Sequence, residues 1–234
     1  GIQNVAIGST ALDAATTDNN NVAIGYGSLT NNNGGENNVA IGSFALEENT
    51  TANNNTAIGF DALEANTTGH SNVAVGANAL DANITASNNT AVGYNSLTAN
   101  TTGTNNNAVG SSSLASNTTG ANNTAMGHAA LAVLSTSNNN TAFGSAALNV
   151  TTGGDNTAVG SNALAANTSA SFNVAVGLNA LKANTTGTQN VAVGANALDA
   201  NTTGLRNTGI GADSLTSNTT GESNVAVGRD AMFH

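Results

Sequence analysis

Cysteine, proline and tryptophan are absent from this chain of 234 residues, and aromatic residues make up only 3% of it. The absence of cysteine excludes disulfide bonds and thiol chemistry, and it leaves the cellular compartment open. The scarcity of large side chains argues against a rounded core. Disordered chains are usually poor in apolar residues and rich in charge, whereas this chain is 39% apolar and 7% charged. The composition therefore predicts an ordered protein.

Positive charge is also scarce, because Lys182, Arg206 and Arg229 face thirteen carboxylates and leave a net charge of −10. Such a chain repels phosphate backbones and anionic membranes, so nucleic acid is not expected as a partner. The longest wholly apolar run, residues 129–134, is far shorter than the roughly 20 residues that cross a bilayer, and no transmembrane segment is expected. The start has no signal-peptide pattern, and Gly1 in place of Met indicates a processed protein or a fragment.

A short motif of the type NVAVG recurs fourteen times along the chain. The spacing is 17 residues throughout, except for 16 between Gly144 and Gly160. We number the columns of the repeat from its first Asn, so that NVAVG fills columns one to five. Column nine is Leu in every repeat but the last, and columns twelve to fifteen usually read NTTG. Column one is Asn in all repeats: Asn4, Asn21, Asn38, Asn55, Asn72, Asn89, Asn106, Asn123, Asn140, Asn156, Asn173, Asn190, Asn207 and Asn224.

Each repeat contains the pattern of a short strand and a turn. Apolar residues alternate with period two in NVAVG, which is typical of a strand. The stretch around the Leu, such as residues 78–80, predicts a second strand, and ANTTG has the residues of a turn. Seventeen residues are too few for a strand–helix–strand unit. The sequence therefore predicts an all-β fold, a parallel β-solenoid (β-roll) of fourteen 17-residue coils in a single domain, residues 1–234.

Stacking is required for stability, because one coil cannot fold alone. Burial of columns two, four and nine contributes about 1.5 to 3 kcal/mol for each residue, whereas ordering a backbone costs about 1 to 2 kcal/mol per residue. Stacked strands about 4.8 Å apart share one core and predict a rod about 65 Å long. We expect the column-one amides to form a structural ladder, each donating to one neighbour and accepting from the other. Small residues in columns three, five and eight indicate a close approach, either of the opposite wall or of a neighbouring chain.

These motifs resemble a known group of surface proteins. NVAIG, NTAVG and NVAVG, each followed by a small residue and Leu, are similar to the head repeats of trimeric autotransporter adhesins and to β-solenoid repeat arrays of bacterial and phage tail-fibre-type surface proteins. The resemblance covers the whole chain, although a unit of 17 residues is longer than is usual in adhesin heads. It implies a parallel β-roll that is often trimeric, extracellular or on a virion, and used for attachment.

No converging catalytic group is expected, since His70, His128 and His234 fall in different columns of distant coils. We expect no enzyme activity, no cofactor and no metal site. Column ten contains Asp13, Glu47, Glu64 and Asp81. These carboxylates are interpreted either as a metal site or as a solvated acidic face, and the second interpretation is preferred. The repeated Asn-Thr-Thr and Asn-Thr-Ser triplets match glycosylation acceptors, but the turn interpretation is preferred. They begin at Asn49, Asn66, Asn100, Asn117, Asn167, Asn184, Asn201 and Asn218.

A few large side chains are candidates for surface contacts. The aromatic residues Tyr26, Phe60 and Tyr94 share column six, with Phe44 beside them in column seven. Two interpretations are open. Either these rings stack on sugars or on a second copy of the chain, or they are isolated variations of the surface. Val133 and Leu134 replace the usual Ala and Asn in the eighth repeat. They indicate either a lateral contact or a tolerated change in a loop.

The function expected is that of a non-enzymatic structural subunit of an extracellular fibre or surface adhesin. Because no polar segment caps either end, copies are expected to stack head to tail, unless the chain is a trimmed piece. Self-association, as a fibre or a homotrimer, and host or surface glycans are the expected partners. The alternatives are carbohydrate binding through column six, and ice binding through the Thr residues of columns thirteen and fourteen.

Overall fold

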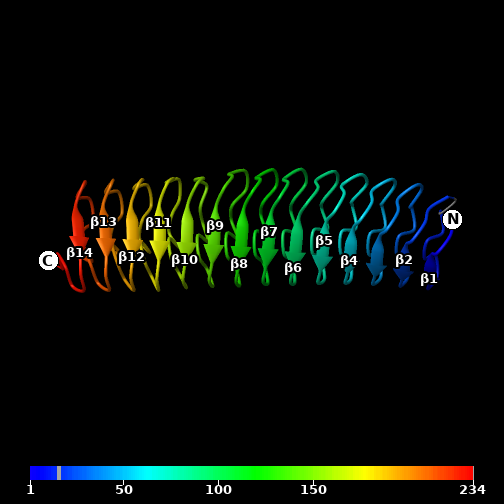
Figure 1. The fold of residues 1–234 in the computed structure, drawn as a ribbon, viewed down its shortest axis with the longest axis horizontal. Helices are drawn as coiled ribbons and strands as arrows, with labels where there is room; N and C mark the ends of the chain where they lie inside the picture. The colour runs from blue at the N-terminus through cyan, green and yellow to red at the C-terminus, as the bar shows by residue number, and fades with distance from the viewer. Residues whose placement is uncertain (15–16, 234) are drawn as a thin grey trace. The chain divides into compact units, whose positions relative to one another are not determined.

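The computed structural model describes residues 1–14 and 17–233, and within them the chain forms short strands and turns with no helix. It divides into two compact units, Gly1–Ala121 and Asn122–His234. Each repeat contributes one strand of three residues, so that each unit holds seven (Figure 1). The strands of the first unit are β1 (Val5–Ile7), β2 (Val22–Ile24), β3 (Val39–Ile41), β4 (Thr56–Ile58), β5 (Val73–Val75), β6 (Thr90–Val92) and β7 (Asn107–Val109). Those of the second are β8 (Thr124–Met126), β9 (Thr141–Phe143), β10 (Thr157–Val159), β11 (Val174–Val176), β12 (Val191–Val193), β13 (Thr208–Ile210) and β14 (Val225–Val227).

Within each unit the strands are parallel and follow one another in sequence order. Equivalent columns pair directly, as in Ala6 with Ala23 in the first unit and Ala175 with Ala192 in the second. The register holds across the shortened repeat, where Thr141 pairs with Thr157. The predicted all-β fold of stacked parallel coils is therefore confirmed, and we call the repeat that contains strand βn coil n.

The strand buries the face opposite to the one we predicted. The column-three Ala of β2–β6 and β8–β12 is fully buried, whereas the side chains of columns two and four in the same strands are half-buried or exposed. Side chains alternate along a strand, so only one of these two sets can face inward. The expectation that columns two and four fill the core is wrong, and the reason is the thinness of the coil.

Gly209, the one column-three residue that is not Ala, shows how thin the coil is. A Cβ added there would lie 3.0 Å from Ser214 Oγ in column eight and 3.4 Å from the side chain of Leu198. The two walls thus leave room for little more than a methyl group. Of the two explanations for small residues in columns three and eight, the structure supports contact with the opposite wall.

Column nine supplies the large side chains of the core, but the segment around it is not a strand. The Leu residues of coils 2 to 12 are fully buried, as predicted. The predicted second strand is wrong, because residues 78 and 80 have φ of 54° and 53°, which an extended chain cannot adopt. The segment is a series of turns, and Leu80 N–H and Ala82 N–H donate to carbonyls of the next coil at 3.1 and 3.2 Å. Alternate N–H groups are therefore satisfied without a strand.

The glycine of column five is required where one coil lies directly on the next. Gly93 has φ of 135°, and a Cβ there would lie 2.7 Å from the carbonyl carbon and oxygen of Gly110. Both the left-handed backbone and the close approach exclude a side chain. The column-five glycine thus fixes the stacking of neighbouring coils.

Two irregularities of the sequence lie in the interior. Leu134 is fully buried in coil 8, so the prediction that it forms a surface contact is wrong, whereas its neighbour Val133 is 48% exposed. In the shortened coil 9, Thr151 occupies the place of the column-twelve Asn and accepts a hydrogen bond from Asn167 Nδ2 at 2.9 Å. The missing residue is thus accommodated at the turn and leaves the strand register unchanged.

Candidate functional surfaces

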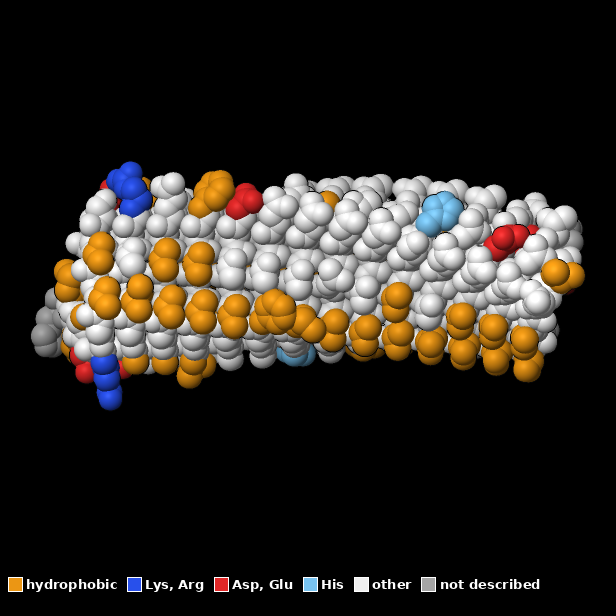
Figure 2. Space-filling model, in the orientation of Figure 1, with side chains coloured by type: hydrophobic (Ala, Val, Ile, Leu, Met, Phe, Trp, Pro, Cys, Tyr) orange, Lys and Arg blue, Asp and Glu red, His pale blue; other side chains and the backbone are white. Residues whose placement is uncertain are grey.

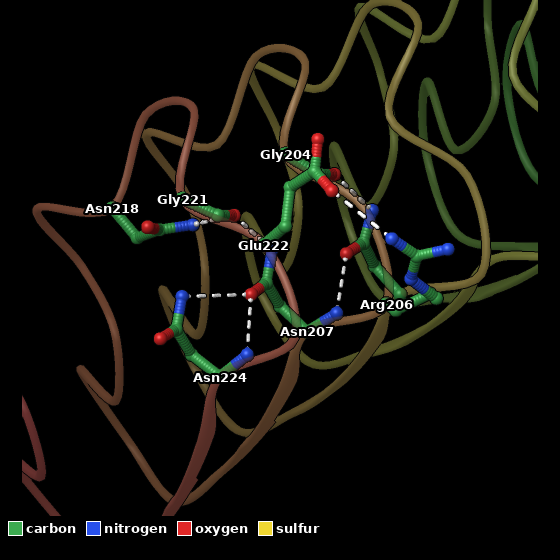
Figure 3. A network of polar contacts seen from close by, with 8 residues as sticks. Gly204, Arg206, Asn207, Asn218, Gly221, Glu222 and Asn224 are labelled. Carbon is green, nitrogen blue, oxygen red and sulfur yellow. Dashed lines mark hydrogen bonds and ion pairs between the residues drawn. The ribbon is translucent and has the colours of Figure 1, made fainter.

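The column-one asparagines form a ladder inside the coil, as predicted, but most of its bonds join a side chain to the backbone. Asn207 shows the pattern: its Nδ2 donates to the carbonyl of Gly221 at 2.7 Å, and its Oδ1 accepts from the backbone N–H of Asn224 at 3.0 Å (Figure 3). Direct amide-to-amide bonds occur at only some steps, such as Asn224 Nδ2 to Asn207 Oδ1 at 3.0 Å. The column-one ladder closes each coil on itself and ties it to the next.

A second ladder runs through column twelve, and we did not predict it. Asn83 Nδ2 donates to Asn66 Oδ1 at 2.8 Å, and Asn100 Nδ2 donates to Asn83 Oδ1 at 3.0 Å. The second hydrogen of each Nδ2 reaches the carbonyl three residues on, as from Asn83 to Ala86 at 3.0 Å. This is the amide-to-amide bonding that we expected of column one. The repetition of Asn in column twelve is the signal in the sequence, but Asn beside Thr and Gly is equally typical of a turn.

Burial of column twelve bears directly on glycosylation. The first Asn of seven of the eight triplets is fully buried, and Asn218 is partly buried. The atom that a glycan would modify is already bonded, as in Asn66, whose Nδ2 donates to Asn49 Oδ1 and to the Gly69 carbonyl. In the folded chain these asparagines are structural.

The threonine columns differ from each other in exposure. Column-thirteen hydroxyls donate to backbone carbonyls of the next coil, as from Thr101 to Thr118 at 3.1 Å and from Thr185 to Thr202 at 3.0 Å. Column-fourteen residues such as Thr102 and Thr186 are exposed. The pair of hydroxyl columns considered for ice binding is thereby reduced to one exposed file.

Apolar side chains cover the outside of the strands. Because column three faces inward, columns two and four face outward. Column four is Ile, Val, Met or Phe on every coil, whereas column two is Val on seven coils, Thr on six and Asn on one. Figure 2 shows orange side chains in files that follow the stacked coils. In β8 to β13, column four is exposed by a little over a third of each residue, from Val176 at 36% to Ile210 at 41%. We call column four of each unit, together with the Val residues of column two, its apolar stripe.

Three of the predicted aromatic residues lie together. The rings of Tyr26 and Phe44 are 5.2 Å apart and nearly perpendicular, and Phe44 and Phe60 are 6.2 Å apart in the same edge-to-face manner. Tyr26 and Phe60 are 54% and 53% exposed, and Phe44 is half-buried between them. Tyr94 is exposed but stands outside this group. We call the three contacting residues the aromatic ridge.

Carboxylates gather on the coils that carry the ridge. Burial, followed by the charges of Glu48 and Asp61, raises the pKa of Glu47. Burial, then Asp61 and Glu47 among other carboxylates, raises the pKa of Glu64. Burial and the charge of Asp81 raise the pKa of Asp61. These shifts indicate negative charges that repel one another at a partly buried surface.

Among the residues that the structure describes, no candidate catalytic side chains come together. His70 and His128 are both exposed and lie in different units, and His234 lies outside the described residues. Among residues 1–14 and 17–233, no three His, Asp or Glu side chains are placed to hold a metal ion. The surfaces available to a partner are therefore the apolar stripe, the aromatic ridge with its carboxylates, and the exposed Thr file.

No family model matches the chain, and no curated protein matches it significantly. The part of the chain that the structure describes holds no helix long and apolar enough to cross a membrane.

Proposed function

We propose that this protein is a non-enzymatic structural subunit of an extracellular fibre or surface adhesin, in which copies associate through the apolar stripe. The observation that carries the proposal is the inverted strand, which buries Ala and presents Val, Ile, Met and Phe to the outside. An exposed apolar surface repeated on every coil is a candidate contact between proteins. The trimeric adhesin heads and tail fibres that the repeats resemble supply the wider context for this role.

The interior supports a structural role. The described amides of both ladders lie inside the coils, where they bond to one another or to backbone carbonyls. A fold that uses its polar side chains to join neighbouring coils is suited to stiffness, and repeats of this kind behave as stacked units.

The stripe favours association of many coils at once. A side chain that is already about two-thirds buried gains roughly 0.5 to 1 kcal/mol from complete burial, whereas association costs at least about 4 kcal/mol. A contact through one or two coils is therefore too weak. Alignment of a whole stripe along a second copy, as in a dimer or trimer of parallel chains, offsets the cost.

Ice binding is less well supported, because the column-thirteen hydroxyls already donate to backbone carbonyls. Only the column-fourteen file remains for an ice surface. A thermal-hysteresis measurement at micromolar protein tests this alternative independently of self-association.

Sedimentation equilibrium tests the proposal on the whole chain. We expect the native protein to be an oligomer, and the double variant V176E/V193E to be monomeric, because it places two charges on neighbouring coils of the stripe. The matched control is T186E/T203E, which adds the same charges at exposed column-fourteen positions of the same two coils and is expected to stay oligomeric. Circular dichroism establishes that both variants are folded. A monomeric native protein at roughly 100 µM, where contacts of about 5 kcal/mol are populated, would overturn the proposal.

Growth end to end is a separate part of the proposal. Electron micrographs of the concentrated native protein are expected to show long filaments, and discrete short particles alone would contradict this mode of assembly while leaving lateral association intact.

A further inference from the structure

The charge of the chain is divided unequally between its two units. Gly1–Ala121 contains eight of the thirteen acidic residues and no Lys or Arg. Lys182, Arg206 and Arg229 all belong to the second unit, where Arg206 already pairs with Glu222 at 3.0 Å. The first unit therefore has no Lys or Arg of its own to neutralise its carboxylates.

Five of these carboxylates lie on three successive coils. Glu47 and Glu48 are on coil 3, Asp61 and Glu64 on coil 4, and Asp81 on coil 5. Their mutual influence on pKa places them within electrostatic reach of one another. A cation that bound here would relieve their repulsion.

The aromatic ridge and the carboxylates form one surface. A Cβ added at Gly27 would lie 2.8 Å from Phe44 Cδ1 and 3.8 Å from Glu47 Oε1, so the ring and the carboxylate lie side by side above Gly27. Asp61 follows Phe44 in column seven of the next coil, and it is also the residue after Phe60. The backbone of Phe44 is left-handed, with φ of 58°, a conformation that costs a bulky residue energy.

The chemistry of this surface matches a guanidinium group better than other ligands. An Arg side chain stacks on an aromatic face and pairs with a carboxylate through its planar N–H donors. Lys supplies the charge without the planar geometry. Neutral sugars use aromatic faces but gain nothing from unpaired negative charge, and anionic sugars are repelled.

We propose that the aromatic ridge of Tyr26, Phe44 and Phe60, together with Glu47, Asp61 and Glu64, docks an Arg-rich segment of a partner protein. This contact is distinct from the self-association proposed above, since it uses columns six, seven and ten in place of the apolar stripe.

Binding of a fluorescein-labelled peptide made of four Arg-Gly-Ser units, measured by fluorescence anisotropy on the full chain, tests the proposal. We expect saturable binding that weakens with salt, and weaker binding of the peptide in which Lys replaces Arg. The variants use residues found in the same columns of other repeats, so that folding is preserved: F44N/F60S removes two rings, and E47T/E64T removes two charges. Each is expected to weaken binding by at least about tenfold, or about 1.4 kcal/mol.

The matched control is D155N/D213N, which removes two charges in the second unit and places Asn where Asn is common in both columns. It is expected to change the affinity by less than about twofold, a difference within ordinary surface effects. Equal weakening by the control and by E47T/E64T would show general charge attraction and overturn the proposal. A neutral glycan that binds in a manner lost in F44N/F60S but kept in E47T/E64T would overturn it in favour of sugar recognition, and so would failure of the Arg peptide to bind at roughly 100 µM.

Discussion

At the scale of single residues, the column-five glycines are the positions where stacking is least tolerant. Gly93→Ala adds a methyl group within 2.7 Å of the Gly110 carbonyl and forces Ala into φ of 135°. We expect a loss of about 2 to 5 kcal/mol in the free energy of unfolding, from strain and overpacking together. Urea denaturation followed by circular dichroism measures it.

Gly228→Ala is the control for that substitution, because a Cβ there meets no described atom within 4 Å although φ is 124°. This variant measures the cost of the left-handed backbone alone, and we expect it to lower the free energy of unfolding by only about 1 to 3 kcal/mol. Equal losses in the two variants would mean that the close contact between coils contributes nothing to the cost of Gly93→Ala.

The column-twelve ladder makes a second prediction at this scale. Asn83→Asp removes both Nδ2 donors, to Asn66 and to Ala86, and puts a charge in a fully buried position. We expect a loss of about 3 to 5 kcal/mol near neutral pH in urea denaturation. Asn162→Asp, in column seven where Asp61, Asp213 and Asp230 occur naturally, is expected to lose less than about 1 kcal/mol. A similar loss in both would contradict a structural role specific to column twelve.

The sequence predicts some of these residue roles and conceals others. An invariant Asn column shows that an amide is needed in every coil, and column one was assigned on that basis. It does not show whether the partner is another amide or a backbone carbonyl, because both satisfy the same donor. Column twelve was missed because Asn beside Thr and Gly is also typical of turns.

At the scale of the strand, periodicity establishes alternation but not direction. Columns two and four must face one way and column three the other, and the larger side chains were expected inside. Because the walls of the coil lie close together, only the small residue of column three fits inside. The spacing of the walls depends on the turns at columns seven and nine, whose left-handed residues include Leu80. Leu80 and Phe44 both have a left-handed backbone, which is not typical of Leu or Phe. The local sequence therefore did not indicate these turns.

The inverted strand predicts an unusual pair of mutational effects. Ala91→Val enlarges a fully buried residue that faces column eight, and we expect a loss of about 1 to 3 kcal/mol. Val92→Ala shortens a half-buried outward residue of the same strand, and we expect a loss of less than about 1 kcal/mol in the dissociated protein. Thermal unfolding of both variants at low concentration measures the difference. A larger loss for Val92→Ala than for Ala91→Val would support a core made of columns two and four, as the sequence predicts.

The acidic surface of coils 3 to 5 predicts how stability changes with pH. Burial and neighbouring charge raise the pKa of Glu47 and Glu64, so the folded chain holds protons more tightly than the unfolded chain. The stabilising contribution of these groups is complete below their unfolded pKa, about 4.3 for Glu, and is lost as pH rises through the higher folded pKa. We expect the urea denaturation midpoint of the native chain to rise as the pH is lowered from 7 towards about 4.3. The variant E47Q/E64Q is expected to be more stable at pH 7 and flatter with pH, and a profile as steep as that of the native chain would contradict this account.

At the scale of the whole molecule, the repeat is the reason why the fold could be predicted at all. Fourteen copies of one pattern fix the register of every coil, and the structure keeps that register within each unit. The partner surfaces could not be predicted with the same success, because they depend on which side of each strand faces outward and on single departures from the repeat. The aromatic residues of columns six and seven were visible as departures, whereas the contact between Phe44 and Gly27 required the structure.

Stacking of equivalent coils makes a prediction about deletions. Removal of residues 72–88 takes out one complete coil and joins Ser71 to Asn89, so that column seventeen is again followed by column one. Because each coil contacts only its neighbours, the shortened chain is expected to fold and to lose roughly 5 °C or less in melting temperature.

Removal of residues 72–79 deletes fewer residues but should do more damage. The nine residues that remain of coil 5 are too few to form a coil that stacks in register, so Leu80 and Asn83 leave the core and both ladders are interrupted. Scanning calorimetry is expected to show a much larger loss for this shorter deletion than for the complete coil. A larger loss for the deletion of residues 72–88 would mean that the chain is stabilised by its total length and not by the register of its coils. The contacts between equivalent columns, including both ladders, would then contribute little to stability.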